Sequence, residues 1–175
     1  MESLKPFLIP IAGLKVGIHQ FDYQIDETFF QHFENSPIHT GKVQLSLEFD
    51  KRSDMIILGF DLKGKTPMAC DRCTADINLP FEGNYTLIVK YEDESDDTES
   101  DLVYIHREET ILDVSKFAYE YICLSIPLIK VYDCDLEEEL PCNTSILDRL
   151  NQPFSEDNDD EPPNNPIWDA LKDLK

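Results

Sequence analysis

The sequence lacks any run of 18 apolar residues, which excludes a transmembrane helix of ordinary length. Residues 1–7 lack the long apolar core and small-residue cleavage site of a secretory signal. Glycine is scarce, at 6 of 175 residues, and no glycine-rich phosphate loop or Gly-x-Ser-x-Gly nucleophile motif is present. We therefore expect a cytoplasmic protein that is not an enzyme, has no small-molecule substrate and binds no membrane.

Basic residues are also few, since 15 Lys and Arg stand against 36 Asp and Glu, for a net charge of −21. Three segments, 92–101, 133–139 and 156–161, hold 17 of the acids and no base, so the rest of the chain carries a net charge of only −4. Blocks of like charge repel one another and usually stay solvated. The acidic segments therefore serve solubility or offer a docking site for a basic partner.

The five cysteines are an odd number, and we expect a reducing compartment, so the sequence does not predict a disulfide framework. Cys70 and Cys73 lie three positions apart, and Cys134 and Cys142 follow about 60 residues later. Four thiolates can hold zinc as a tetrahedral structural site, although the gap between the second two is long and acidic. Two alternatives stay open: turn cysteines without a metal, and a redox pair. The redox pair is disfavoured because no helix follows the motif to lower a thiol pKa.

The first half of the chain alternates polar and apolar residues as strands do. Strands are predicted at residues 14–25, with a bulge near Gln20, at 43–49, at 55–62 before Gly64 and Pro67, and at 102–105. A hairpin of residues 77–81 and 85–91 is predicted to turn at 82–84, and a short helix is predicted after residue 26. The fold class predicted is α+β, with a mainly antiparallel sheet or a partly closed barrel, one central helix and short C-terminal helices.

Helical spacing replaces the strand pattern further along the chain. We predict a central helix at about 113–125, started by Asp113 or Thr110, and a short helix at 146–150 capped by Ser145. The predicted organisation is a single β-rich domain at 1–151 with an acidic loop at 92–101, a flexible acidic linker at 152–164 and an amphipathic helix at 165–175. This last helix places Ile167, Trp168 and Leu171 on one face, which must dock onto the domain or onto a partner because so short a helix is marginal alone.

Direct RNA binding would need a local basic surface, and five cations are candidates. These are Lys51, Arg52, Lys63, Lys65 and Arg72, which we expect to share one end of the sheet, with Lys42 and Lys90 as extensions. Arg72 can alternatively pair with a carboxylate of the hairpin. The acidic pI opposes tight non-specific binding to phosphate, so contact with a protein is favoured over contact with RNA.

Three short segments in a fixed order carry a family resemblance. They are the Cys-x-Arg-Cys turn at residues 70–73, the helix end Ile122-Cys123-Leu124-Ser125-Ile126-Pro127-Leu128, and the terminal Asn165-Pro166-x-x-x-Ala170-Leu171. With the β-rich first half, the acidic insertion and the second cysteine region, the chain resembles the YceD family, the large ribosomal RNA subunit accumulation proteins.

The resemblance implies a non-catalytic factor needed for normal levels of the large-subunit ribosomal RNA. The expected partner is a ribosomal protein or a large-subunit rRNA precursor. Many members carry a second Cys-x-x-Cys after the helix, whereas Cys134 and Cys142 here are eight positions apart, which puts a shared metal site in doubt. The alternative hypothesis is a small zinc-stabilised interaction module unrelated to ribosomes.

Overall fold

The computed structural model describes residues 3–34, 36–91, 102–131 and 141–152. Its contacts divide the chain into a first unit, Met1–Cys142, and a second, Asn143–Lys175. In the second unit the described helix is α3 (Thr144–Asn151), whose N-cap is Asn143 rather than the predicted Ser145. The predicted linker and terminal helix, which begin at 152 and 165, lie almost wholly outside the described residues.

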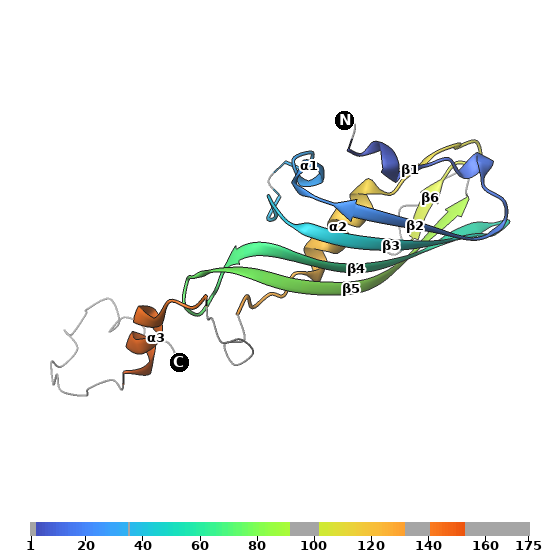
Figure 1. Cartoon of the computed structure of the whole chain (residues 1–175). Coiled ribbons are helices and arrows are strands. Elements are labelled where there is room, and N and C mark those ends of the chain that lie inside the picture. The colour runs from blue at the N-terminus through green and yellow to red at the C-terminus, as the bar shows by residue number, and fades with distance from the viewer. Residues whose placement is uncertain (1–2, 35, 92–101, 132–140, 153–175) are drawn as a thin grey trace, which may run out of the picture. The chain divides into compact units, whose positions relative to one another are not determined.

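Five strands form the main sheet of the first unit, in the order β2-β3-β4-β5-β6. They are β2 (Gly17–Ile25), β3 (Lys42–Lys51), β4 (Met55–Ala69), β5 (Asp76–Tyr91) and β6 (Leu102–Ile105). The first four are antiparallel neighbours, and β6 runs parallel to β5. Figure 1 shows a twisted, open sheet with β4 and β5 as its long strands. The predicted α+β class is confirmed, and the sheet is not a closed barrel.

Short elements before and after the sheet complete the unit. They are η1 (Lys5–Phe7), β1 (Leu8–Ile9), η2 (Ile11–Gly13), α1 (Glu27–Phe30), β7 (Leu112–Asp113) and α2 (Ser115–Ser125), with β1 pairing to β7 in a second, two-stranded sheet. Asp26 caps α1, since its carboxylate accepts hydrogen bonds from the Thr28 amide at 2.9 Å and hydroxyl at 2.6 Å. The N-cap of α2 is Val114 rather than the predicted Asp113 or Thr110, although the Asp113 carboxylate accepts a hydrogen bond from the Ser115 amide at 2.9 Å.

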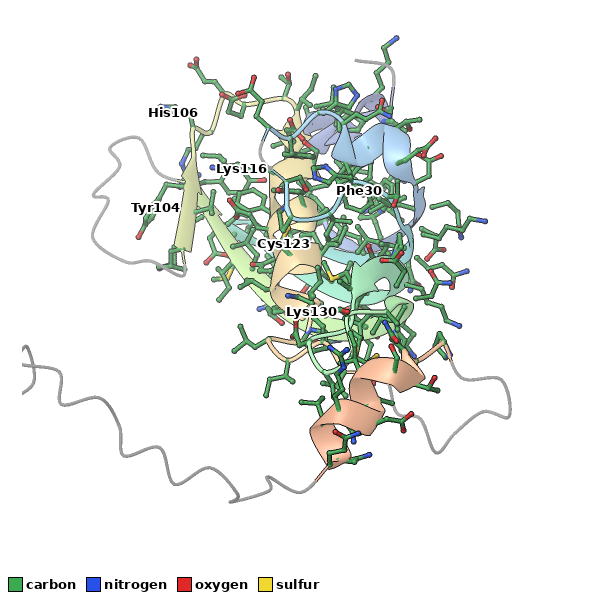
Figure 2. The ribbon with its side chains drawn as sticks, turned by 90° about the vertical axis from the view of Figure 1, so that its left-hand side faces the viewer. Phe30, Tyr104, His106, Lys116, Cys123 and Lys130 are labelled. Atoms are coloured by element: carbon green, nitrogen blue, oxygen red, sulfur yellow. The ribbon has the colours of Figure 1, made fainter. Side chains whose placement is uncertain are left out.

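The core lies between one face of the sheet and α2. Alternate residues of β3, such as Leu45, Leu47 and Phe49, are fully buried, while their neighbours are mostly exposed. The helix contributes Ala118 and Ile122 to the same cluster, and its N-cap residue contributes Val114. Figure 2 shows α2, labelled at Lys116 and Cys123, lying against the strands. Burial of the apolar stripe on α2 explains why its sequence follows the helical period.

The bulge predicted near Gln20 is absent. Pairing between β2 and β3 is continuous from Gly17 opposite Lys51 to Ile25 opposite Val43. The change in alternation arises because Ile18 points outward, with 68% of its surface exposed. An exposed isoleucine, rather than an extra residue in the strand, therefore explains the pattern.

The prediction was also wrong about where β4 ends and where the hairpin turns. β4 continues through Gly64 and Pro67, and β5 runs unbroken through residues 82–84, so the hairpin turn lies at 70–75 instead. Gly64 is required by packing, because a Cβ there would lie 2.8 Å from the Phe81 ring and 2.9 Å from the Lys42 carbonyl oxygen. Pro67 is tolerated because it lies beyond Lys65, the last residue of β4 that pairs with β3.

Candidate functional site

The cysteine turn connects the two longest strands and is closed by backbone hydrogen bonds. The Cys70 amide donates to the Ala75 carbonyl at 2.8 Å, and the Thr74 amide donates to the Cys70 carbonyl at 2.8 Å. Thr74 has a φ of 57°, in the left-handed region that a tight turn often needs. This geometry places Cys70 and Cys73 on one turn, with both side chains buried.

The segment that follows α2 is bound to this turn through Asp71. The Asp71 amide donates to the Lys130 carbonyl at 2.7 Å, and the Lys130 amide donates to the Asp71 carboxylate, also at 2.7 Å. The Lys130 ammonium lies 4.0 Å from the same carboxylate. Two residues 59 positions apart in sequence therefore hold the turn and the segment together.

Three of the four predicted zinc ligands belong to the described residues. Cys70 and Cys73 share one turn and Cys142 is half-buried, whereas Cys134 lies outside the described residues. Among the described residues, no group of three or more His, Cys, Asp or Glu side chains is placed to hold a metal ion. Two buried thiols on one turn fit half of a four-thiolate site in donor chemistry, so zinc stays a prediction.

The other described cysteine of the first unit, Cys123, lies on α2. Burial raises the pKa of its thiol, and a hydrogen bond with Tyr119 lowers it to a smaller extent. A raised pKa keeps the thiol protonated near neutral pH, and the thiolate is the nucleophilic form. Cys123 thus has the character of a packing residue.

The predicted basic surface is divided between two ends of the sheet, so the expectation of one shared end is wrong. Lys51 and Arg52 lie at the β3–β4 turn, whereas Lys63 and Lys65 lie near the far end of β3, about 30 Å along the strand at 3.3 Å per residue. The Lys51 ammonium donates to the Ile11 and Leu14 carbonyls at 2.6 and 2.8 Å. The Arg52 guanidinium lies 2.8 Å from the Asp50 carboxylate.

The two possible extensions separate in the same way. Lys42 pairs with Lys65 across β3 and β4, whereas Lys90 pairs with Met55 at the opposite end. Arg72 is exposed on the cysteine turn, beyond the end of β3. The structure therefore assembles a different group from the one predicted: Lys42, Lys63 and Lys65, hereafter the lysine cluster.

An open groove of about 1320 Å³ lies at the lysine cluster. All three lysines line it, together with the amide side chains of Gln24, Gln44 and Asn78. Further lining residues are Asp26, Glu27, Thr40, Gly41, Val43, Gly64, Pro67, Pro80, Phe81, Glu82, Ser125 and Pro127. The wall is mixed in charge, with the cations concentrated on neighbouring strands.

A second surface feature follows the C-terminal end of α2. Four apolar side chains are exposed within eight residues: Leu124 at 67%, Leu128 at 96%, Ile129 at 74% and Val131 at 40%. We call these four residues the apolar strip. The strip was not among the predicted binding residues, although the apolar run after Pro127, with neither helical nor strand alternation, was a visible signal. The predicted contact residues Ile167, Trp168 and Leu171 lie outside the described residues.

A family model matches most of the chain. The family described as large ribosomal RNA subunit accumulation protein YceD matches residues 58–175, which include the cysteine turn and the apolar strip. Neither the curated proteins nor the solved structures contain a match. Within the described residues, no helix has both the length and the apolar character needed to cross a membrane. Because the family match spans well over half of the chain and agrees with the predicted resemblance, this protein belongs to the YceD family of large ribosomal RNA subunit accumulation proteins.

Proposed function

We propose that this protein is a non-enzymatic accessory factor that supports accumulation of the large-subunit ribosomal RNA by binding a basic ribosomal protein. The family name supplies the role in rRNA accumulation. The apolar strip is the observation that carries the choice of a protein as partner. This contact would protect the ribosomal protein, or the site on the rRNA precursor to which that protein binds, during subunit assembly.

Exposure on the strip is unusual for apolar side chains so close together. Leu128 and Ile129 are adjacent, and each leaves about three quarters or more of its surface in contact with solvent. Contiguous exposed apolar residues are typical of protein interaction sites. Lys130, between Ile129 and Val131, is hydrogen-bonded to Asp71, so the cysteine turn holds the strip in place as long as the turn itself stays closed. A preordered surface loses less conformational entropy on binding.

Charge selects the kind of partner. The chain has a net charge of −21, and five acids at positions 133–139 follow the strip directly in sequence. Proteins that contact rRNA phosphates need Lys and Arg for that purpose and therefore carry positive surfaces. Opposite charge around an apolar contact steers association and disfavours acidic partners.

Co-sedimentation of the full chain with large-subunit precursors at low salt tests this function. The variant Leu128→Ser/Ile129→Ser removes the two most exposed side chains of the strip, and Leu150→Ser, at a 61% exposed residue of α3, is the matched control. We expect the double variant to lose at least about tenfold in bound fraction, as for a central interface residue, and the control to match the wild type. Crosslinking should then identify a basic ribosomal protein.

Two results would contradict the proposal. Wild-type protein that stays at the top of the gradient under every salt condition would remove the role in subunit assembly. Undiminished binding by the double variant would show that the partner binds elsewhere.

A further inference from the structure

The lysine cluster brings like charges together at a cost to the fold. Lys42 lies directly opposite Lys65 on β3 and β4, and Lys63 is two residues away on the same exposed face. Cations directly opposite each other in an antiparallel pair repel and destabilise the sheet. In a chain with only 15 basic residues against 36 acidic ones, such a pairing has no evident benefit for folding.

Several of the other described cations are already paired within the protein. Lys51, Arg52, Lys116 and Lys130 each have a carbonyl or carboxylate partner. In contrast, the three cluster lysines form no hydrogen bond or ion pair within the described part of the chain. Lys63 lies opposite Glu82 on β5, yet no ion pair joins the two side chains in the described part of the chain. Their ammonium groups are therefore available to an external anion.

The remaining wall of the groove indicates which anion fits. Gln24, Gln44 and Asn78 are exposed and line the groove beside the lysines. An amide side chain both donates and accepts hydrogen bonds, so it can contact base edges and 2′-hydroxyl groups. Pro67 and Pro80 are exposed apolar surfaces in the same wall. Three point charges, three amides and apolar surface match the phosphates, base edges and ribose of a nucleotide chain, and the carboxylates of Asp26, Glu27 and Glu82 in the same wall restrict the phosphate contacts to the three lysines.

We propose that the lysine cluster and its groove bind the phosphate backbone of single-stranded RNA. The site uses other residues than the apolar strip, so it adds an RNA contact to the proposed function instead of replacing the protein contact. Lys42 lies outside the part of the chain that the family model matches. The proposal about the complete cluster therefore concerns this chain and not the family as a whole. The contact is local, since the acidic remainder of the molecule repels further phosphates.

Salt dependence of binding tests the site with the full chain. The probe is a fluorescent single-stranded oligouridine RNA, with anisotropy measured between 50 and 200 mM salt. Three phosphate contacts to a single strand predict a slope of log K against log salt near −2, at about −0.7 per contact. The variant Lys42→Gln/Lys63→Gln/Lys65→Gln should bring this slope close to zero and weaken binding at least tenfold at low salt.

The matched control is Lys15→Gln/Lys90→Gln/Lys116→Gln, which changes the net charge equally at residues outside the groove lining. We expect it to keep the wild-type slope. The cluster variant should melt at the same temperature as the wild type or higher, since it removes like-charge repulsion, and this excludes unfolding as the cause of lost binding.

Three outcomes would overturn the proposal: no binding by the wild type at low salt, equal losses in the two triple variants, or displacement of the RNA by equimolar polyglutamate. The third would assign the groove to an acidic protein segment instead. Failure of the proposed function is separable, because Leu128→Ser/Ile129→Ser should lose co-sedimentation while its affinity for oligouridine stays unchanged.

Discussion

Tyr23 on β2 is the buried side chain that lacks a polar partner in the described part of the chain. Its ring stacks on Phe7 with centroids 4.5 Å apart, and its hydroxyl has no hydrogen bond there. Burial raises the pKa of Tyr23 to about 12. A buried hydroxyl without a partner loses its hydration and gains nothing in return, so the ring stabilises the core while the oxygen destabilises it.

We predict that Tyr23→Phe is more stable than the wild type by about 1 kcal/mol at pH 7, because it keeps the ring contact and removes the unpaired hydroxyl. The raised pKa also sets a pH dependence. An unfolded tyrosine ionises near pH 10, so the contribution of the neutral form is complete below pH 10 and is lost as pH rises toward 12. Urea unfolding at pH 7 and pH 11 measures both effects.

The variant should lose less stability than the wild type between these two pH values. Some alkaline loss remains in both, because burial also raises the pKa of Tyr91 and Tyr119. A variant less stable at pH 7, with an unchanged alkaline decline, would show that the hydroxyl has a favourable contact.

At the scale of elements, the contact between α2 and β5 depends on Gly83. A Cβ at this position would clash with the Ser125 hydroxyl and lie 2.7 Å from the Tyr85 ring. That hydroxyl donates to the Tyr121 carbonyl at 2.7 Å, and the Tyr85 and Tyr121 rings stack with centroids 4.6 Å apart. The end of the helix therefore packs against the strand backbone itself, which only glycine permits.

We predict that Gly83→Ala destabilises the protein by about 1–3 kcal/mol, the usual cost of forcing extra volume into a packed contact. Gly59→Ala on β4 is the control, because its Cβ would meet the Glu48 Cβ at an ordinary 3.7 Å. The control should be neutral or up to about 1 kcal/mol more stable, since alanine loses less entropy than glycine in a strand. Thermal unfolding of both variants compares the costs, and equal values would contradict this account of Gly83.

Alternation and helical period were sufficient to predict most elements, because strand β3 and helix α2 each bury one regular face. Gly64, Pro67 and Gly83 were interpreted as turn residues, which is their common local role. The actual role of the two glycines depends on Phe81 and Ser125, which reach them only in the folded chain, and Pro67 is accommodated because it lies beyond the pairing with β3. The lysine cluster could not be predicted without the strand register for the same reason, because Lys42 and Lys65 become neighbours only when β3 and β4 pair.

At the scale of the whole molecule, a zinc site would join the cysteine turn to residues 134–142. We predict about one zinc per chain purified under reducing conditions, and none in Cys70→Ser/Cys73→Ser, because the turn supplies two of four thiolates. Cys123→Ser is the control and should keep the metal. Elemental analysis and the melting temperature with and without a chelator measure the effect, since structural zinc contributes to folding free energy. Wild-type protein that is purified without zinc, and whose melting temperature does not change when zinc is added, would refute the zinc site.

The pairing of β4 and β5 changes character along its length. Residues Ile56–Lys65 of β4 pair with β3 on one side and with β5 on the other, whereas Thr66–Ala69 of β4 pair with β5 alone. On the other side of β5, the described β6 pairs only with Ile88–Tyr91. A two-stranded ribbon is marginally stable in water. Backbone amides near Met68 and Asn78 should thus exchange with solvent deuterium sooner than those near Leu58 and Leu87. The segment that carries both turn thiols can consequently unfold locally while the five-stranded region stays intact.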